Sequence, residues 1–189
     1  MKEIHPSQCK TIVLLLTNNF PLAEKVIKQL EKKLGPLELQ SPWFHFDHTN
    51  YYEDELGVGL KRCLLGFKKI CEPHRLRELK KFTKRLEKKF GRRPLTPPSS
   101  TRGEDLRGIN IDPGYVDLFK VVLASGKSGG QKVALSKDVY AHPLLRFGHN
   151  QWDPFVWTFP DFQSKQYHKY FLNLRQSLRM DPRLRGDDN

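Results

Sequence analysis

The hydrophobic pattern first predicts a buried strand. Residues 11–16 (TIVLLL) are β-branched or aliphatic, and the polar stretch Thr17-Asn18-Asn19 follows directly. A short apolar run that ends in turn-forming residues is typical of a buried strand. An amphipathic helix is predicted next, because Pro21 suits its first turn and Gly35-Pro36 suits its end. Apolar residues recur between them at three-to-four spacing, at Leu22, Val26, Ile27, Leu30 and Leu34.

The next elements repeat this alternation. Residues 37–47 are predicted to be extended and interrupted by Pro42, and residues 60–70 read as another strand. A second helix is predicted over residues 73–90, with Leu76, Leu79, Phe82, Leu86 and Phe90 on one face. A flexible loop over residues 92–108 and a short strand over 109–112 follow. The order strand–helix–strand–strand–helix–strand predicts an α+β fold with a ferredoxin-like split βαβ core.

The last third of the chain predicts an extension of this core. Pro113-Gly114 is expected to turn the chain, and the apolar positions of 115–123 favour a helix over a buried strand. Strands at 132–135 and 139–147 are expected to form a hairpin around Lys137-Asp138. A closing helix is predicted over residues 164–178. Residues 1–179 then form a single domain, and residues 180–189 a disordered charged tail.

Length and composition narrow the class of protein. The chain has 189 residues, of which 38% are hydrophobic and 11% aromatic, so it can bury a core. Its longest apolar stretch, Ile12 to Leu16, falls far short of the about 18 residues of a transmembrane helix. The sequence also lacks a signal-peptide pattern, so we expect a cytoplasmic protein without a membrane partner. Cys9, Cys63 and Cys71 are too few and too scattered for a disulfide framework, and Cys63 and Cys71 are expected to pack as small hydrophobes.

The net charge of +12 lies almost entirely in one segment. Residues 61–93 contain 14 Lys and Arg residues against 3 Glu residues, a net charge of +11 that falls mainly on the helix at 75–93. One interpretation is a solvated helix face, and the other is contact with a polyanion such as RNA. The sequence contains no RRM, KH or zinc-finger signature. The candidate nucleic-acid contacts on this helix are Lys80, Lys81, Lys84, Arg85 and Lys88.

A separate group of residues predicts a ligand site at the ends of the sheet strands. Four carboxylates and two tyrosines lie within residues 46–55, and Asp112 and Tyr115 flank the Pro-Gly pair. Such carboxylates can bind a cation, transfer protons or pair with the abundant Lys and Arg. His45 and His48 lack a third nearby ligand, so no metal site is expected. The candidate ligand-binding residues are Asp47, Tyr51, Tyr52, Glu53, Lys61, Asp112 and Tyr115.

Two further motifs carry weaker signals. Ser125-Gly126-Lys127-Ser128 resembles the end of a phosphate-binding loop, but Val121 stands where that pattern requires glycine, and no helix is expected directly after it. The aromatic side chains of residues 152–162 are expected to pack in the core or under a lid rather than to stack on a ligand.

Four strings resemble one known family. They are FHFDHTNYYEDELGVGLKR (44–62), FKKICEPHRLRELKKFT (67–83), INIDPGYVDLFKVVLAS (109–125), and DVYAHPLLRF with WDPFVWTFPDF (138–162). Together they resemble the uncharacterised prokaryotic family called domain of unknown function 4416, over about residues 10–178. Members have sometimes been labelled GTP-binding, although this sequence has no complete phosphate loop or base-specificity motif. The resemblance implies no functional residue, cofactor or reaction.

Two classes of function therefore stay open. The first is a small enzyme or ligand-binding protein that holds a small anionic molecule or nucleotide at the sheet ends. The second is an RNA-binding protein that uses the basic helix.

Overall fold

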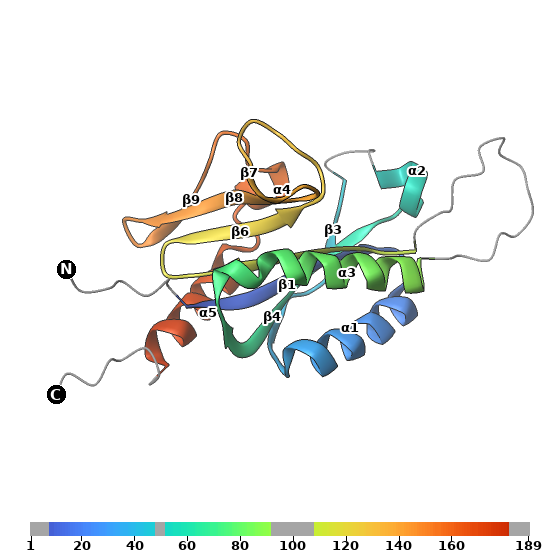
Figure 1. The fold of residues 1–189 in the computed structure, drawn as a ribbon, viewed down its shortest axis with the longest axis horizontal. Coiled ribbons are helices and arrows are strands. Elements are labelled where there is room, and N and C mark those ends of the chain that lie inside the picture. Colours follow the sequence, from blue (N-terminus) through green and yellow to red (C-terminus); the bar gives the residue numbers. More distant parts are fainter. Residues whose placement is uncertain (1–7, 48–51, 92–107, 182–189) are drawn as a thin grey trace, which may run out of the picture.

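A large antiparallel sheet forms the centre of the protein (Figure 1). The computed structural model describes residues 8–47, 52–91 and 108–181. The sheet runs in the order β2-β4-β1-β5-β6-β8-β7, with β3 paired to β4 and β9 paired to β8. Its strands are β1 (Cys9–Thr17), β2 (Leu37–Gln40), β3 (Phe44–His45), β4 (Lys61–Cys71), β5 (Asn110–Val116), β6 (Lys120–Ser125), β7 (Val133–Ser136), β8 (Val139–Gly148) and β9 (Gln151–Pro154).

Helices cover both faces of this sheet. They are α1 (Phe20–Leu34), α2 (Glu53–Leu56), α3 (Leu76–Phe90), α4 (Pro160–Gln163) and α5 (His168–Met180), and a 3₁₀ turn (Pro73–Arg75) precedes α3. Strand β1 alternates between two apolar clusters, because successive strand residues point to opposite faces. Val13 and Leu15 pack with side chains of α1 and α3, whereas Ile12 and Leu14 pack in the cluster that contains α5. The continuous apolar run of β1 is thus explained by burial on both faces.

Local signals set the bounds of the first helix as predicted. The Asn19 side chain accepts a hydrogen bond from the Leu22 backbone N–H at 3.1 Å, which caps α1, and Pro21 lies in its first turn. Gly35, with φ of 93°, ends it. The helix predicted over 73–90 and the hairpin around Lys137-Asp138 are also present, as the 3₁₀ turn plus α3 and as β7 with β8.

The prediction of a helix over residues 115–123 was wrong. This segment forms the end of β5, a turn and the start of β6. The Asp117 carboxylate accepts hydrogen bonds from the backbone N–H groups of Phe119 and Lys120, at 2.7 and 2.8 Å, and so stabilises the turn. The β-branched residues on both sides of that turn favour strands.

The turn predicted at Pro113-Gly114 was also wrong, because both residues lie inside β5. Within β5, the residues that pair with β6 are Gly114 to Val116. Pro113 therefore lies where β5 forms no hydrogen bonds with β6, and its missing N–H is tolerated there. Gly114 is required by close packing, since an added Cβ would lie 2.4 Å from the Val122 carbonyl oxygen.

The C-terminal part differs from the predicted closing helix in its bounds. A short helix, α4, precedes α5, and α5 continues to Met180. Within the aromatic run, Trp152 and Phe162 are buried in the core as expected. Phe155 and Trp157 instead stack on each other nearer the surface, with ring centroids 5.0 Å apart, and Phe159 is 44% exposed. Residues 92–107 of the predicted loop and 182–189 of the predicted tail lie outside the described residues. No helix in the described part of the chain has the length and apolar character to cross a bilayer.

Candidate functional site

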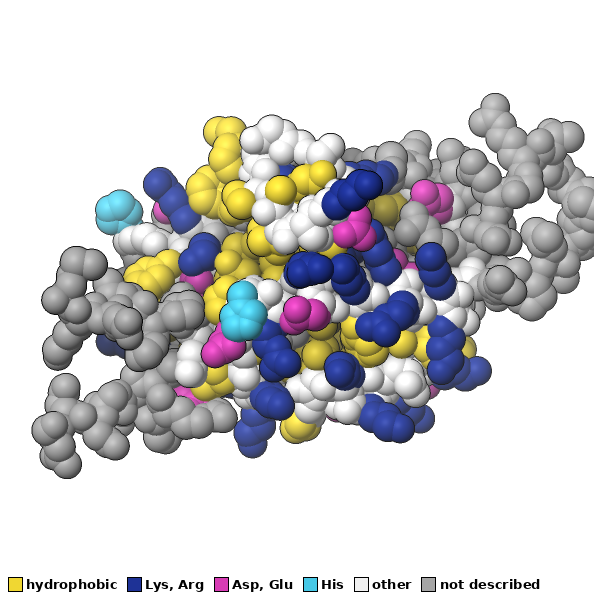
Figure 2. All heavy atoms as spheres, in the orientation of Figure 1, with side chains coloured by type: hydrophobic (Ala, Val, Ile, Leu, Met, Phe, Trp, Pro, Cys, Tyr) yellow, Lys and Arg dark blue, Asp and Glu magenta, His cyan; other side chains and the backbone are white. Residues whose placement is uncertain are grey.

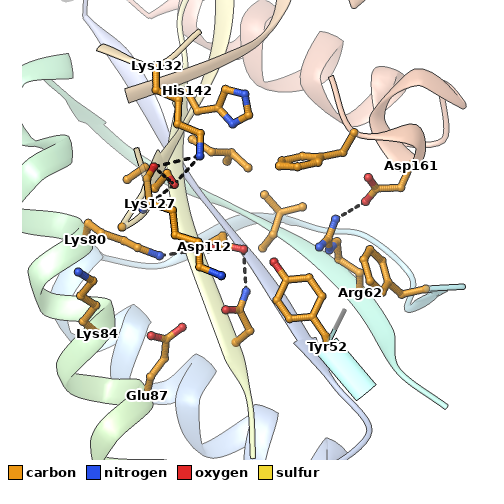
Figure 3. A pocket seen from close by; sticks show the side chains of 18 of the residues that line it. Tyr52, Arg62, Lys80, Lys84, Glu87, Asp112, Lys127, Lys132, His142 and Asp161 are labelled. Atoms are coloured by element: carbon orange, nitrogen blue, oxygen red, sulfur yellow. Dashed lines mark hydrogen bonds and ion pairs between the residues drawn. The ribbon is translucent and has the colours of Figure 1, made fainter. Parts of the chain in front are cut away.

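A cavity of about 670 Å³ lies where the sheet divides (Figure 3). We call it the central pocket. Its walls come from α3, β5, β6, β8, the loop after β6 and the start of α4, with Tyr52 before α2 and Arg62 of β4 at one side. This volume lies in the range of small-molecule sites.

The pocket exists because β5 and β6 separate. Their pairing covers Gly114 to Val116 of β5. Beyond it, residues 110–113 pair with β1 and with no other described strand. The end of β6 pairs only with β8. Helix α3 covers the open side of β5, where the Glu87 carboxylate accepts a hydrogen bond from the Ile111 backbone N–H at 2.7 Å. Polar side chains of both strands and of α3 therefore face one space.

One wall carries a buried charged network. The Lys80 amino group, on α3, donates to the Asp112 carboxylate of β5 at 3.1 Å, and the Asn110 amide donates to the other carboxylate oxygen at 2.7 Å. Lys80 is only 5% exposed. Burial opposes ionisation of Asp112, but the positive charges of Lys80 and Arg62 outweigh it and hold the pKa of this carboxyl below its usual value.

A second wall gathers lysines around the loop after β6. The Lys132 amino group donates to the Ser125 hydroxyl and to the Lys127 backbone carbonyl, both at 3.0 Å. Lys84 of α3 lies against the same loop, because a Cβ on Gly126 would be 3.1 Å from its amino nitrogen. Burial first, and then the charge of Lys127, lower the pKa of Lys132. We call Lys84, Lys127 and Lys132 the lysine end of the pocket.

The opposite side is built on a buried ion pair between Arg62 of β4 and Asp161 of α4. The Arg62 guanidinium also lies over the Phe46 ring, 4.1 Å from its centroid. Arg62 Nε and one Asp161 oxygen, Oδ1, are buried and have no hydrogen-bond partner among the described residues. We call Arg62, Asp161 and Phe46 the arginine end of the pocket.

His142 of β8 adds a third buried polar atom, its Nε2, that no described residue contacts through a hydrogen bond. The residue is 3% exposed, and its ring packs edge-on against Phe159. Burial first, and then the charge of Lys132, lower its pKa to about 4. The imidazole is therefore neutral near pH 7, with one nitrogen that donates and one that accepts. Unsatisfied buried polar atoms are rare and destabilising, so these three atoms indicate hydrogen bonds that the described part of the chain does not complete.

The structure brings only part of the predicted ligand site together. Tyr52 and Asp112 line the central pocket. Asp47 is exposed outside it, Lys61 lies over the Phe20 ring at 5.8 Å, and Tyr115 lines a separate cavity. Tyr51 lies outside the described residues, as does the side chain of Glu53.

The predicted nucleic-acid contacts divide between two faces of α3. Lys80 and Lys84 turn toward the central pocket. Lys81, Arg85 and Lys88 do not line it, and Arg85 and Lys88 are exposed. Figure 2 shows Lys and Arg side chains over this surface of the molecule, with few carboxylates among them. The charge of the helix therefore serves both a cavity and an outer surface.

Sequence reasoning did not select Arg62, Lys127, Lys132, His142 or Asp161 as site residues. A signal existed for most of them. Arg62, His142 and Asp161 fall in the strings that carry the family resemblance, and Lys127 belongs to the Ser-Gly-Lys-Ser motif. Among the described residues, no group of three or more His, Cys, Asp or Glu side chains is placed to hold a metal ion.

The fold and the site define an α+β protein with one large antiparallel sheet and a cavity lined by basic side chains. The chain belongs to the DUF4416 family, which is described as a domain of unknown function, and the family model matches residues 7–178. The motif resemblance noted in the sequence is thereby confirmed. No curated protein and no solved structure matches the chain significantly.

Proposed function

We propose that the central pocket binds a small organic anion, with its anionic group at the lysine end. The observation that carries this proposal is the convergence of Lys84, Lys127 and Lys132 from two separate parts of the chain around Ser125. In the whole lining, five cationic side chains face three carboxylates. A phosphate or carboxylate group would offset the mutual repulsion of these lysines and accept charge-assisted hydrogen bonds from them.

The remainder of the pocket suits the organic part of such a molecule. The rings of Phe46, Tyr52 and Phe159 offer apolar surface. Arg62 Nε, Asp161 Oδ1 and His142 Nε2 offer hydrogen-bonding atoms that have no partner within residues 8–47, 52–91 and 108–181. A ligand that carries both donors and acceptors could satisfy them after a small adjustment of the wall. Sugar phosphates and nucleoside phosphates both meet this description.

Calorimetric titration tests the proposal. The probes are inorganic pyrophosphate, then a panel of sugar phosphates, nucleoside phosphates and dicarboxylates. Lys132→Gln removes one cation from the lysine end, so we expect binding to weaken by about tenfold to a hundredfold, the value of a hydrogen bond to a charged group. Lys137→Gln is the matched control, because Lys137 is an exposed lysine of the adjacent hairpin turn and does not line the pocket.

Two outcomes would contradict the proposal. One is that no compound in the panel binds or raises the melting temperature. The other is that Lys137→Gln weakens binding as much as Lys132→Gln does, because the effect would then be one of net charge alone.

The outer face of α3 favours a second candidate function, the binding of RNA through Lys81, Arg85 and Lys88. These side chains lie outside the pocket and on a strongly basic helix. RNA affinity should then fall steeply with added salt, and replacing these three residues with Glu should abolish it while pyrophosphate binding persists. Fluorescence anisotropy with a single-stranded RNA measures both effects, and unchanged RNA affinity in the triple variant would exclude this face.

We also infer that β1, α1, β2, β4, α3 and β5 correspond to the ferredoxin-like unit expected from the element order. The adjacency β2-β4-β1-β5, with every pairing antiparallel, supports this assignment. In that arrangement β6–β9, α4 and α5 are an addition, and the central pocket lies between the unit and the addition. We expect the protein to act in the cytoplasm.

A further inference from the structure

A second cavity, of about 510 Å³, has a cysteine in its wall. It lies between the end of β4, the start of α3 and β5, and Cys71, Thr11 and Tyr115 line it. Cys71 is the last residue of β4, and it is half-buried. This cavity is separate from the central pocket, and its chemistry is independent of the proposed function.

Cys71 faces a second thiol directly. In the antiparallel pairing of β1 and β4, Cys9 stands opposite Cys71, and the two Sγ atoms are 3.1 Å apart. Cys9 is fully buried, and its Sγ also lies 3.2 Å from the Cys71 carbonyl oxygen, to which it can donate. The strand register therefore holds two thiols in contact, one inside the core and one at a cavity wall.

The surroundings activate one thiol of the pair and not the other. The Thr11 hydroxyl donates to Cys71 Sγ at 3.1 Å. The hydrogen bond with Cys9 first, and then Thr11 and the charge of Arg75, outweigh burial and lower the pKa of Cys71 below its usual value. The pKa of Cys9 is raised by the hydrogen bond with Cys71 and by burial. Cys71 is thus the nucleophile, since the thiolate is the reactive form.

The charges around the cavity select the sign of the reagent. Lys33, Lys69, Arg75 and Arg85 line it, against Glu72 and Glu78. A net positive rim raises the local concentration of anions. A small molecule that carries carboxylates would therefore reach Cys71 more readily than a neutral or cationic one.

We propose that Cys71 and Cys9 form a reversible dithiol site that reacts with anionic low-molecular-weight disulfides. The Cys71 thiolate attacks one sulfur of the disulfide, the S–S bond of the reagent breaks, and the first small thiolate leaves. Cys9 then loses its proton and attacks Cys71 Sγ, which forms the Cys9–Cys71 bond and expels the second small thiolate. The two protein thiols are oxidised, one reagent disulfide is reduced to two thiols, and the protons pass to the leaving thiolates.

Titration of the full chain with 5,5′-dithiobis(2-nitrobenzoate), an anionic disulfide, tests the proposal. The wild type should rapidly release two equivalents of the coloured thiolate and retain no adduct by mass spectrometry. Cys9→Ser should release one equivalent and retain the adduct on Cys71, because the resolving thiol is missing. Cys71→Ser should lose the fast phase.

Cys63 supplies an internal control. It is fully buried, its Sγ lies 3.2 Å from the Ser41 carbonyl, and burial raises its pKa to about 11. We expect it to react at least about tenfold more slowly than Cys71 near pH 7, because its smaller thiolate fraction slows the reaction by more than its higher nucleophilicity accelerates it. Cys63→Ser should behave like the wild type.

Three results would overturn the inference. The wild type could retain a stable adduct on Cys71, which would exclude the pairing with Cys9. Cys71 could react no faster than Cys63, which would exclude activation. For each reagent, the rate of reaction with Cys71 is divided by its rate with free glutathione. If this ratio is the same for the neutral reagent 4,4′-dithiodipyridine as for the anionic reagent, at low and at high salt, selection for anions is excluded.

Discussion

The buried ion pair between Arg62 and Asp161 allows a quantitative prediction. Arg62 lies on β4 and Asp161 on α4, 99 positions later, so the pair ties the C-terminal part of the chain to the central sheet. The two side chains are 7% and 1% exposed. Replacing Asp161 with Ala removes the counter-charge and leaves a guanidinium that the surrounding wall shields from water.

The expected loss of unfolding free energy follows from this burial. Breaking a buried pair by removing one partner typically destabilises a protein by about 3–5 kcal/mol, because the remaining charge is left uncompensated. With a urea dependence of about 2 kcal/mol per molar, the unfolding midpoint should fall by about 2 M. The stacking of Arg62 on Phe46 remains in the variant, so we expect the lower part of the range.

Urea unfolding followed by tryptophan fluorescence measures the effect. Asp138→Ala is the control, because its pair with Lys84 is long, at 3.9 Å, and both side chains are substantially exposed. It should leave the urea midpoint nearly unchanged, because exposed ion pairs contribute little to stability. The double variant Arg62→Met, Asp161→Leu should recover most of the stability, since no buried charge is left unpaired. If Asp161→Ala costs no more than Asp138→Ala, the reasoning from burial is refuted.

Three further predictions concern stability. Because the folded-state pKa of His142 is about 4 against an ordinary 6.5, the unfolded chain binds an extra proton between these values. The free energy of unfolding should therefore fall as pH drops through that window. The urea midpoint of His142→Gln should fall less over the same window, and parallel curves of midpoint against pH for the wild type and the variant would contradict the prediction. Gly114→Ala should cost at least about 1–3 kcal/mol in urea unfolding, because its Cβ meets a backbone oxygen. Gly66→Ala should cost less, since its new Cβ meets side-chain carbons of Leu174 rather than a backbone atom, and equal losses would count against this. Leu174→Ala should lower the free energy of unfolding by about 2–5 kcal/mol, because Leu174 is buried in the core. Met180 is 62% exposed, so Met180→Ala should cost less than about 0.5 kcal/mol. Similar melting temperatures for the two variants would be inconsistent with the packing of α5.

The regular elements of the first half could be predicted because their signals are local. The run in 11–16 is apolar on both faces, and Asn19 and Gly35 mark the ends of α1 within a few residues of its core positions. Segment 115–123 was misread because its apolar positions fit either period. The deciding contact is the Asp117 turn, together with the pairing of β6 to β8. That pairing joins residues some twenty positions apart, and spacing within one segment does not report it.

The candidate site depends even more on distant contacts. Sequence reasoning found Asp112, Tyr52, Lys80 and Lys84, but assigned the first two and the last two to different functions. The structure places all four in the wall of one cavity, because β5 leaves β6 and α3 covers the gap. In the sequence, Arg62 is one basic residue among the fourteen of residues 61–93, and its contacts with Asp161 and the Phe46 ring, which distinguish it from the others, exist in the folded chain.

By itself, then, the sequence determined the family, the class of the fold, most of the helices and the concentration of charge in residues 61–93. These properties are sums or short-range patterns, and a chain carries them whether or not it is folded. The tertiary structure alone decided which cations enter the pocket, which polar atoms are buried without a partner in the described part of the chain, and that Cys9 meets Cys71. Each of these depends on the register and divergence of strands that are distant in the chain.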